Sequence, residues 1–137
     1  MISDYRRDAV FRRGEEKRAE KRDREAAIQA EVDRLKALSP EGLAVEVLPI
    51  LAAEAAQSTS GRLYVSDICR KLVGTVSGRA NLALTQPVRE ALQRLEHANL
   101  VLQSASAEMG SSWRITREGE QAAAAGSIAD KLGPSTS

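Results

Sequence analysis

The side chains that most often carry covalent or metal chemistry are scarce in this chain of 137 residues. His97 is the only histidine and Cys69 is the only cysteine. A zinc site needs four ligands, or three with a water, and nucleophilic catalysis needs a base held beside the nucleophile. The glycine-containing segment 74–78 lacks the Lys-Ser/Thr pair that completes a phosphate-binding loop. We therefore expect no catalytic residue, no metal site and no cofactor, and we predict that the protein is not an enzyme.

One segment rich in arginine and glutamine suggests a different chemistry, the reading of DNA bases. Within 85–98, Val88, Leu92 and Leu95 recur at the spacing of one helix face, which predicts an amphipathic helix that begins near Thr85. A recognition helix reads base edges from its N-terminal half. Arginine can bind guanine, and glutamine adenine, through paired hydrogen bonds. The candidate DNA-contacting side chains of this helix are Gln86, Arg89, Glu90, Gln93 and Arg94.

Other polar side chains could contact the phosphate backbone, which fixes a protein on DNA without reading its sequence. Two of them fall in the segment 74–84, which we expect to be a loop, and the others flank the remaining predicted elements. The candidates for this role are Arg79 and Asn81, together with Arg62, Arg70, Lys71, Arg114 and Arg117. The alternative is that these are ordinary solvated side chains, because charged residues must face water somewhere.

The rest of the chain supplies the elements that would position these residues. Ser39-Pro40-Glu41 is a typical helix start. Pro49 predicts a kink in that helix, or its division into 40–47 and 49–57. The further expected elements are a strand over 62–65, a helix from Ser66 to Gly74, a hairpin of 100–103 and 112–115 around a loop at 104–111, and a helix from Thr116 to Gly126.

This order of elements predicts a winged helix-turn-helix, a mainly α fold with a small β-hairpin wing (α+β) and a charged helix before it. Each helix has one narrow apolar stripe, so none can bury that stripe without the others. The expected domains are a charged N-terminal helix at 1–38, the winged helix at 39–126 and a disordered tail at 127–137. The residues expected to meet in one core are Leu51, Ile68, Leu72, Val88, Leu92 and Leu95.

Two short motifs stand at the spacing of a helix–hairpin–helix unit. The segment 88–101 reads VREALQRLEHANLV, and the segment 113–120 reads WRITREGE. The first resembles the recognition helix and first wing strand of MarR/PadR-type winged-helix regulators, and the second resembles the second wing strand and the helix start that follows it. The resemblance covers about residues 47–125. It implies a prokaryotic or phage transcriptional regulator that binds a specific double-stranded DNA sequence as a dimer, through the helix at 85–98 and the wing at 104–111.

Residues 1–38 differ in composition from the rest, since they hold eleven of the 20 basic and nine of the 19 acidic residues. We expect 1–25 to be a frayed or solvated charged helix. Ile28, Val32 and Leu35 then follow at the spacing of a coiled-coil seam. We predict a homodimer whose contact lies in a helix at 26–57, in the helix at 116–125, or in both. The alternative is that this stripe rests on its own domain.

The overall composition limits the classes of function. The formal net charge is +1, which excludes a strongly basic nucleic-acid tail. The longest apolar stretch, 43–56, contains charged residues and is shorter than the roughly 20 residues of a membrane helix, so we expect no membrane partner. The single cysteine favours a reducing compartment, and hence a cytoplasmic protein. The leading hypothesis is a DNA-binding regulator, and the alternative is a winged-helix adaptor that docks on a protein partner through residues 1–38.

Overall fold

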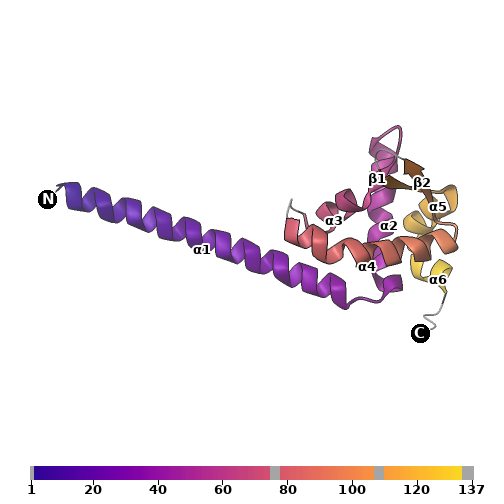
Figure 1. The fold of residues 1–137 in the computed structure, drawn as a ribbon, viewed down its shortest axis with the longest axis horizontal. Helices are drawn as coiled ribbons and strands as arrows, with labels where there is room; N and C mark the ends of the chain where they lie inside the picture. Colours follow the sequence, from indigo (N-terminus) through magenta and orange to yellow (C-terminus); the bar gives the residue numbers. More distant parts are fainter. Residues whose placement is uncertain (1, 75–77, 107–109, 134–137) are drawn as a thin grey trace.

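The computed structural model describes residues 2–74, 78–106 and 110–133, and it describes side chains in 13–74, 82–105 and 110–133. Helices dominate, and three short strands form one antiparallel sheet in the order β1-β3-β2. Figure 1 shows a long N-terminal helix that leads into a bundle of shorter helices and the sheet. The elements are α1 (Ile2–Ala37), α2 (Pro40–Gln57), β1 (Leu63–Tyr64), α3 (Val65–Val73), α4 (Gly78–His97), β2 (Val101–Ser106), β3 (Gly110–Ile115), α5 (Arg117–Ala125) and α6 (Ile128–Leu132).

Helix α2 begins where the sequence predicts but does not divide at Pro49. The hydroxyl of Ser39 accepts a hydrogen bond from the Gly42 N–H at 3.0 Å, which caps the first turn. The helix then continues without a break to Gln57, so the predicted division into 40–47 and 49–57 is wrong. Pro49 is exposed, whereas Val47 and Leu51 on either side of it are fully buried. Both halves of the helix are therefore held against the same core, and this packing outweighs the hydrogen bond that proline removes.

Helix α4 begins at Gly78, seven residues before the predicted start. The expected loop at 74–84 is therefore wrong over 78–84, and its segment 75–77 lies outside the described residues. The cause is Leu84, which is fully buried and extends the apolar stripe by one turn before Val88. Because of this earlier start, Pro87 lies inside the helix and not in its first turn. Helix α3 ends at Gly74, whose φ of 79° is the left-handed conformation that glycine adopts readily.

The predicted hairpin is confirmed. Val101 pairs with Ile115 and Gln103 with Trp113 in an antiparallel register. The strands run on to Ser106 and from Gly110, so the predicted loop at 104–111 is shorter than expected, and its central residues 107–109 are not described. Strand β1 joins the free edge of β3, where Leu63 pairs with Trp113. The predicted strand at 62–65 is thus shorter, because the chain turns into α3 at Val65.

One hydrophobic core joins the helices to the sheet. All six of the predicted core residues belong to it, with Leu72 at its edge and the others fully buried. Helix α4 packs against α2 and α3, and the base of the hairpin packs against α2. The large side chains that are fully buried are Leu35, Leu43, Leu48, Leu51, Ile68, Leu84, Leu92, Leu95, Leu100, Val47, Val88 and Val101.

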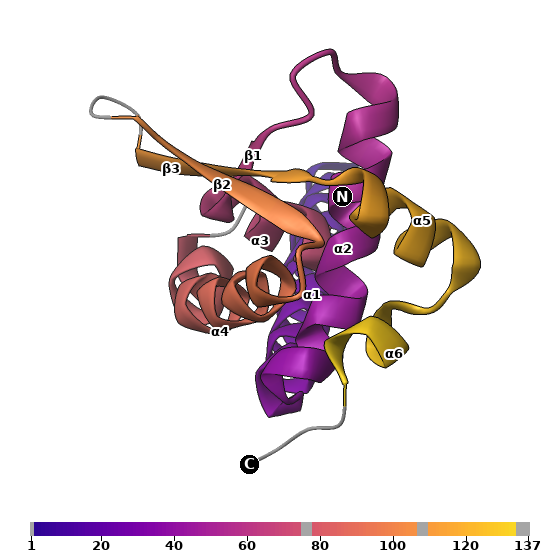
Figure 2. The same cartoon turned by 90° about the vertical axis from the view of Figure 1, so that its right-hand side faces the viewer.

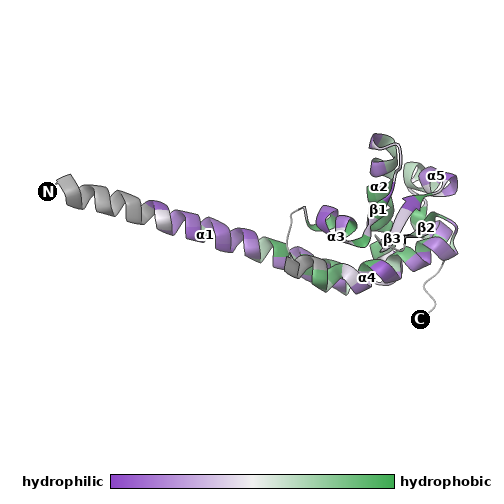
Figure 3. Cartoon of the chain, turned by 45° about the horizontal axis from the view of Figure 1, so that its top comes forward, coloured by the Kyte–Doolittle hydropathy of each residue, from purple (hydrophilic) through white to green (hydrophobic). Residues whose placement is uncertain are grey.

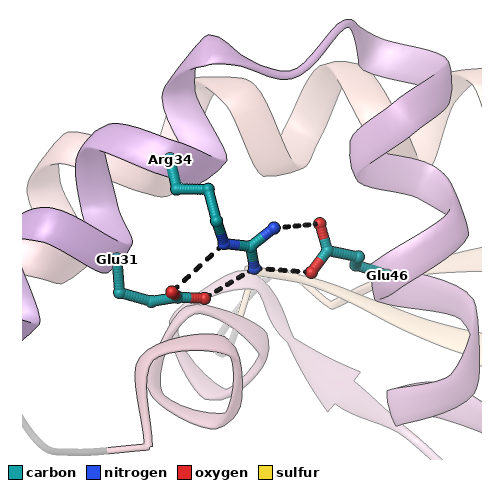
Figure 4. Close-up of polar contacts among 3 residues, drawn as sticks. All are labelled: Glu31, Arg34 and Glu46. Carbon is teal, nitrogen blue, oxygen red and sulfur yellow. Dashed lines mark hydrogen bonds and ion pairs between the residues drawn. The ribbon is translucent and has the colours of Figure 1, made fainter.

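Among the residues whose side chains the structure describes, helix α1 packs on this core through its C-terminal turns. Val32 and Leu35 are 3% and 0% exposed and Ile28 is partly buried against the same core, so the stripe that motivated a homodimer packs within its own chain. Arg34 reinforces the attachment, because its guanidinium binds Glu31 at 2.6 Å and Glu46 of α2 at 2.7 Å (Figure 4). Every residue from Glu15 to Ala27 is exposed. Figure 3 shows the corresponding hydrophilic stretch of α1 leading away from the apolar bundle.

The C-terminal segment is more ordered than predicted. Thr116 caps α5 by accepting a hydrogen bond from the Gly119 N–H at 3.0 Å, and α5 ends at Gly126 with a φ of 68°. The predicted disordered tail at 127–137 is wrong over 128–132, which form α6 with Ile128 5% exposed, and residues 134–137 lie outside the described residues. The buried isoleucine, packed against α2, offsets the entropy of ordering this short segment. None of the described helices has both the length and the apolar character needed to cross a membrane.

Candidate nucleic-acid interface

The outer face of α4 presents three of the predicted residues together. Gln86, Arg89 and Gln93 are exposed, whereas Val88, Leu92 and Leu95 on the opposite face have no exposed surface. The polar and the apolar residues occupy different faces of the helix because of their spacing. Packing of the apolar face on α2 and α3 therefore turns the polar face outward. We call Gln86, Arg89 and Gln93 the α4 stripe.

The α4 stripe borders a groove of about 650 Å³ between α3, α4 and the hairpin. Figure 2 shows α4 and the hairpin on the same side of the molecule, with α3 between them and with α5 and α6 on the opposite side. The groove is therefore bounded by elements from three separate parts of the chain. Its lining residues are Tyr64, Val65, Ser66, Thr85, Arg89, Gln93, Glu96, Gln103, Gly110, Ser111 and Trp113.

The hairpin gives the groove a polar wall over a buried base. The amide nitrogen of Gln103 donates a hydrogen bond to the hydroxyl of Ser111 at 2.9 Å. Trp113 is only 4% exposed, and its indole nitrogen has no hydrogen-bond partner within the described part of the chain. Buried indole N–H groups usually find a partner. The groove is thus a cleft with polar side chains in its wall and the largely buried Trp113 among its lining residues.

Arg89 differs from the other arginines around it in being free to bind an external group. Within the ranges that the structure describes, no ion pair or side-chain hydrogen bond engages Arg89. By contrast, Arg70 pairs with Asp67, and Arg94 pairs with Glu41 of α2 at 3.5 Å. A guanidinium without a carboxylate partner keeps all five of its donors for a ligand. Arg94 is directed by its ion pair toward α2, so the structure separates it from the α4 stripe, while Glu90 is exposed between the two.

Two of the remaining predicted DNA-contacting residues, Arg114 and Arg117, do not join the α4 stripe. Arg114 lies opposite Leu102 in the strand register, on the sheet face away from Gln103 and Trp113. It lines a separate cavity of about 90 Å³ beside the end of α2. Arg117 is exposed at the start of α5, which lies across the molecule from α4 (Figure 2). Arg79 and Asn81 belong to the first turns of α4, and their side chains lie outside the described residues.

A second basic group lies on the other side of α3. Arg62, Arg70 and Lys71 border a cavity of about 660 Å³ together with Glu54 and Asp67. The two carboxylates offset part of the positive charge, and Arg70 is already paired with Asp67. This cavity is therefore a weaker candidate for an anionic ligand than the groove beside Arg89.

Several groove residues were missed by sequence reasoning. Tyr64, Ser66, Gln103 and Ser111 come from four elements, β1, α3, β2 and β3, whose proximity is decided by packing, and no local pattern marks them. Leu82 was missed for another reason, because it falls in the segment that was predicted to be a loop. The position of Leu84, four residues before Val88, is the signal that could have extended the helix back to include it.

The structure adds no site for metal or nucleophilic chemistry within its described residues. No three His, Cys, Asp or Glu side chains of that part of the chain gather where they could hold a metal ion. Cys69 is buried, and this burial raises the pKa of its thiol to about 11, so the thiolate is rare at neutral pH. Comparisons of the chain with protein-family models, with curated proteins and with solved structures found no match.

Proposed function

We propose that this chain is a winged-helix protein that binds a specific sequence of double-stranded DNA and regulates transcription. In this proposal α4 enters the major groove as the recognition helix, and the β2–β3 hairpin is the wing beside it. The resemblance of 88–101 and 113–120 to MarR/PadR-type regulators supports the same function. We further propose that the protein acts in the cytoplasm as a two-fold dimer, because paired recognition helices can occupy successive major grooves.

The observation that carries the proposal is the α4 stripe with its unpaired arginine. An α-helix fits the major groove, where guanine offers two acceptors to a guanidinium and adenine a donor and an acceptor to an amide. Gln86, Arg89 and Gln93 are exposed along one line of such a helix. The neighbouring groove keeps space beside Arg89 on the side of the hairpin. The formal net charge of the chain is +1, so overall charge contributes little to the affinity for DNA. We therefore expect specific contacts to contribute more to this affinity than non-specific attraction to phosphate does.

A selection on random DNA duplexes tests this function. Wild type should enrich one sequence at moderate salt, and Arg89→Ala should lose the preference at one base position. Arg117→Ala is the matched control, because it removes an exposed arginine from the far side of the molecule and should leave the enriched sequence unchanged. If wild type enriches no sequence, the regulator proposal fails.

A second candidate function, a winged-helix adaptor, is favoured by one observation. The helix surface from Glu15 to Ala27 is exposed all round and is held clear of the core. A partner protein could bind this surface without competing with α4. An adaptor should show no sequence preference in the selection, and its affinity for DNA should show no steep dependence on salt.

A further inference from the structure

Leu82 is a large apolar side chain that is not buried in the core. It is 82% exposed, while the two other exposed large hydrophobic residues among those described, Val45 and Leu102, are 37% and 56% exposed. Leu84, two residues later, is fully buried and supplies the core contact of this turn. A leucine exposed to this extent contributes nothing to the core, so its apolar surface is free to contact a partner.

Leu82 is aligned with the α4 stripe. It precedes Gln86 by four residues, Arg89 by seven and Gln93 by eleven, all within the single helix Gly78–His97. At 3.6 residues per turn, these four side chains fall within an arc of about 60°. Leu82 is therefore the first member of the same exposed line among the described side chains. Because a recognition helix reads bases mainly from its N-terminal half, Leu82 is better placed than Gln93 for this task.

The chemistry of the major groove offers one base feature that suits an aliphatic side chain. Thymine carries a methyl group at C5, and apolar side chains contact it, whereas the other edge groups of the bases are hydrogen-bond donors and acceptors. We propose that Leu82 reads the 5-methyl group of a thymine in the target sequence. This inference rests on the proposed function, because it assumes that α4 enters the major groove.

Uracil tests the proposal directly, because deoxyuridine pairs with adenine and differs from thymidine only by the missing methyl group. Each thymine of the selected duplex is replaced in turn by deoxyuridine, and the Kd is measured for wild type and for Leu82→Ala. Wild type should bind about fourfold more weakly at one replaced position, the effect of losing one buried methyl-sized group. Leu82→Ala should bind the thymine and uracil duplexes within a factor of two of each other.

Leu102→Ala is the matched control. It also truncates an exposed leucine, but on β2 and on the sheet face that Arg114 shares. It should keep the full fourfold sensitivity to uracil. Thermal unfolding of Leu82→Ala should match that of wild type, which would assign the lost sensitivity to the contact and not to the fold.

The outcomes separate this inference from the function on which it rests. If wild type enriches no sequence, the proposed function and the role of Leu82 both fail. If wild type enriches a sequence but no uracil replacement weakens binding, or if Leu82→Ala keeps the same sensitivity as wild type, then Leu82 does not read a methyl group, while the proposed sequence-specific binding of DNA stands.

Discussion

Gly119, in the first turn of α5, lies directly against the backbone carbonyl of Leu100. A Cβ at position 119 would overlap the carbonyl oxygen of Leu100 and would lie 2.6 Å from Cγ1 of Ile115. The same carbonyl accepts a hydrogen bond from the Thr116 N–H at 3.0 Å. The absence of a side chain at Gly119 is therefore what allows α5 to pack on the base of the hairpin.

Gly119→Ala is expected to lower the free energy of unfolding by about 1–3 kcal/mol, the usual effect of forcing an extra group into packed backbone. Urea denaturation measures the change. Gly14→Ala is the matched control, because a Cβ at this helical position meets nothing within 4 Å. Alanine favours a helix more than glycine does, so that control should not destabilise the protein. Equal stability of Gly119→Ala and wild type would show that α5 can move away from Leu100.

Leu92→Ala is expected to lower the free energy of unfolding by about 2–5 kcal/mol, because its side chain is fully buried and its loss leaves a cavity. Leu82→Ala, on the same helix, should change stability by less than about 0.5 kcal/mol, as surface substitutions usually do. Both values come from chemical denaturation. A small effect of Leu92→Ala would contradict the packing of α4 on α2 and α3.

The Glu31 carboxyl should titrate below its ordinary range. The hydrogen bond from Arg34 holds the pKa of Glu31 below its ordinary value, against the opposing effect of desolvation. A carboxyl whose pKa is lower in the folded state stabilises that state above its unfolded pKa, and loses this contribution as the pH falls through the folded pKa. A carbon-detected NMR titration measures the pKa of Glu31. In Arg34→Gln the pKa should return to its ordinary value, and an unchanged pKa would rule out the ion pair in solution.

Sedimentation of the protein at micromolar concentration, with and without its selected DNA, tests the predicted homodimer. The chain has a mass of 14.8 kDa. After the mass of the duplex is subtracted, the protein in the complex should have twice the mass of one chain. Because Leu35 is buried within its own chain, Leu35→Ala should lower stability and leave the assembly unchanged. A protein that stays a monomer on its DNA would exclude the dimer.

Arg89→Ala should weaken binding to the selected duplex by about 1–3 kcal/mol, the range for a bidentate contact between a side chain and a base. Fluorescence anisotropy at two or more salt concentrations provides the measurement. Arg114→Ala is expected to have little effect, because Arg114 lies on the sheet face away from the groove. If Arg114→Ala weakens binding to all sequences alike and lowers the salt dependence, then that face of the sheet contacts phosphate.

The local features of the fold could be predicted because each depends on few neighbouring residues. Ser39 and Thr116 cap the two helices that were predicted to begin beside them. The pairing of 100–103 with 112–115 followed from alternating side chains on either side of a polar turn. These signals are short-range, and the structure confirms them.

The failures arise where tertiary packing overrides a local signal. Pro49 predicted a kink or a division of its helix, and α4 was predicted to begin near Thr85, yet α2 runs undivided through Pro49 and α4 begins at Gly78. The alignment of Gln86, Arg89 and Gln93 could be predicted from spacing alone. The separation of Arg94 and Arg114 from that line could not, because it depends on Glu41 of α2 and on the register of β3.

The exposed segment of α1 determines both the distance from the core and the angle about the helix axis at which the residues before it are held. Its helix axis is set by Val32 and Leu35, which are locked into the core, and no other described contact restrains residues 15–27. Each residue inserted into this segment would turn everything N-terminal to it by about 100° and move it by about 1.5 Å. Whatever is attached before residue 15 is therefore presented to the core at a defined angle, which an insertion of one residue would change and an insertion of seven would nearly restore.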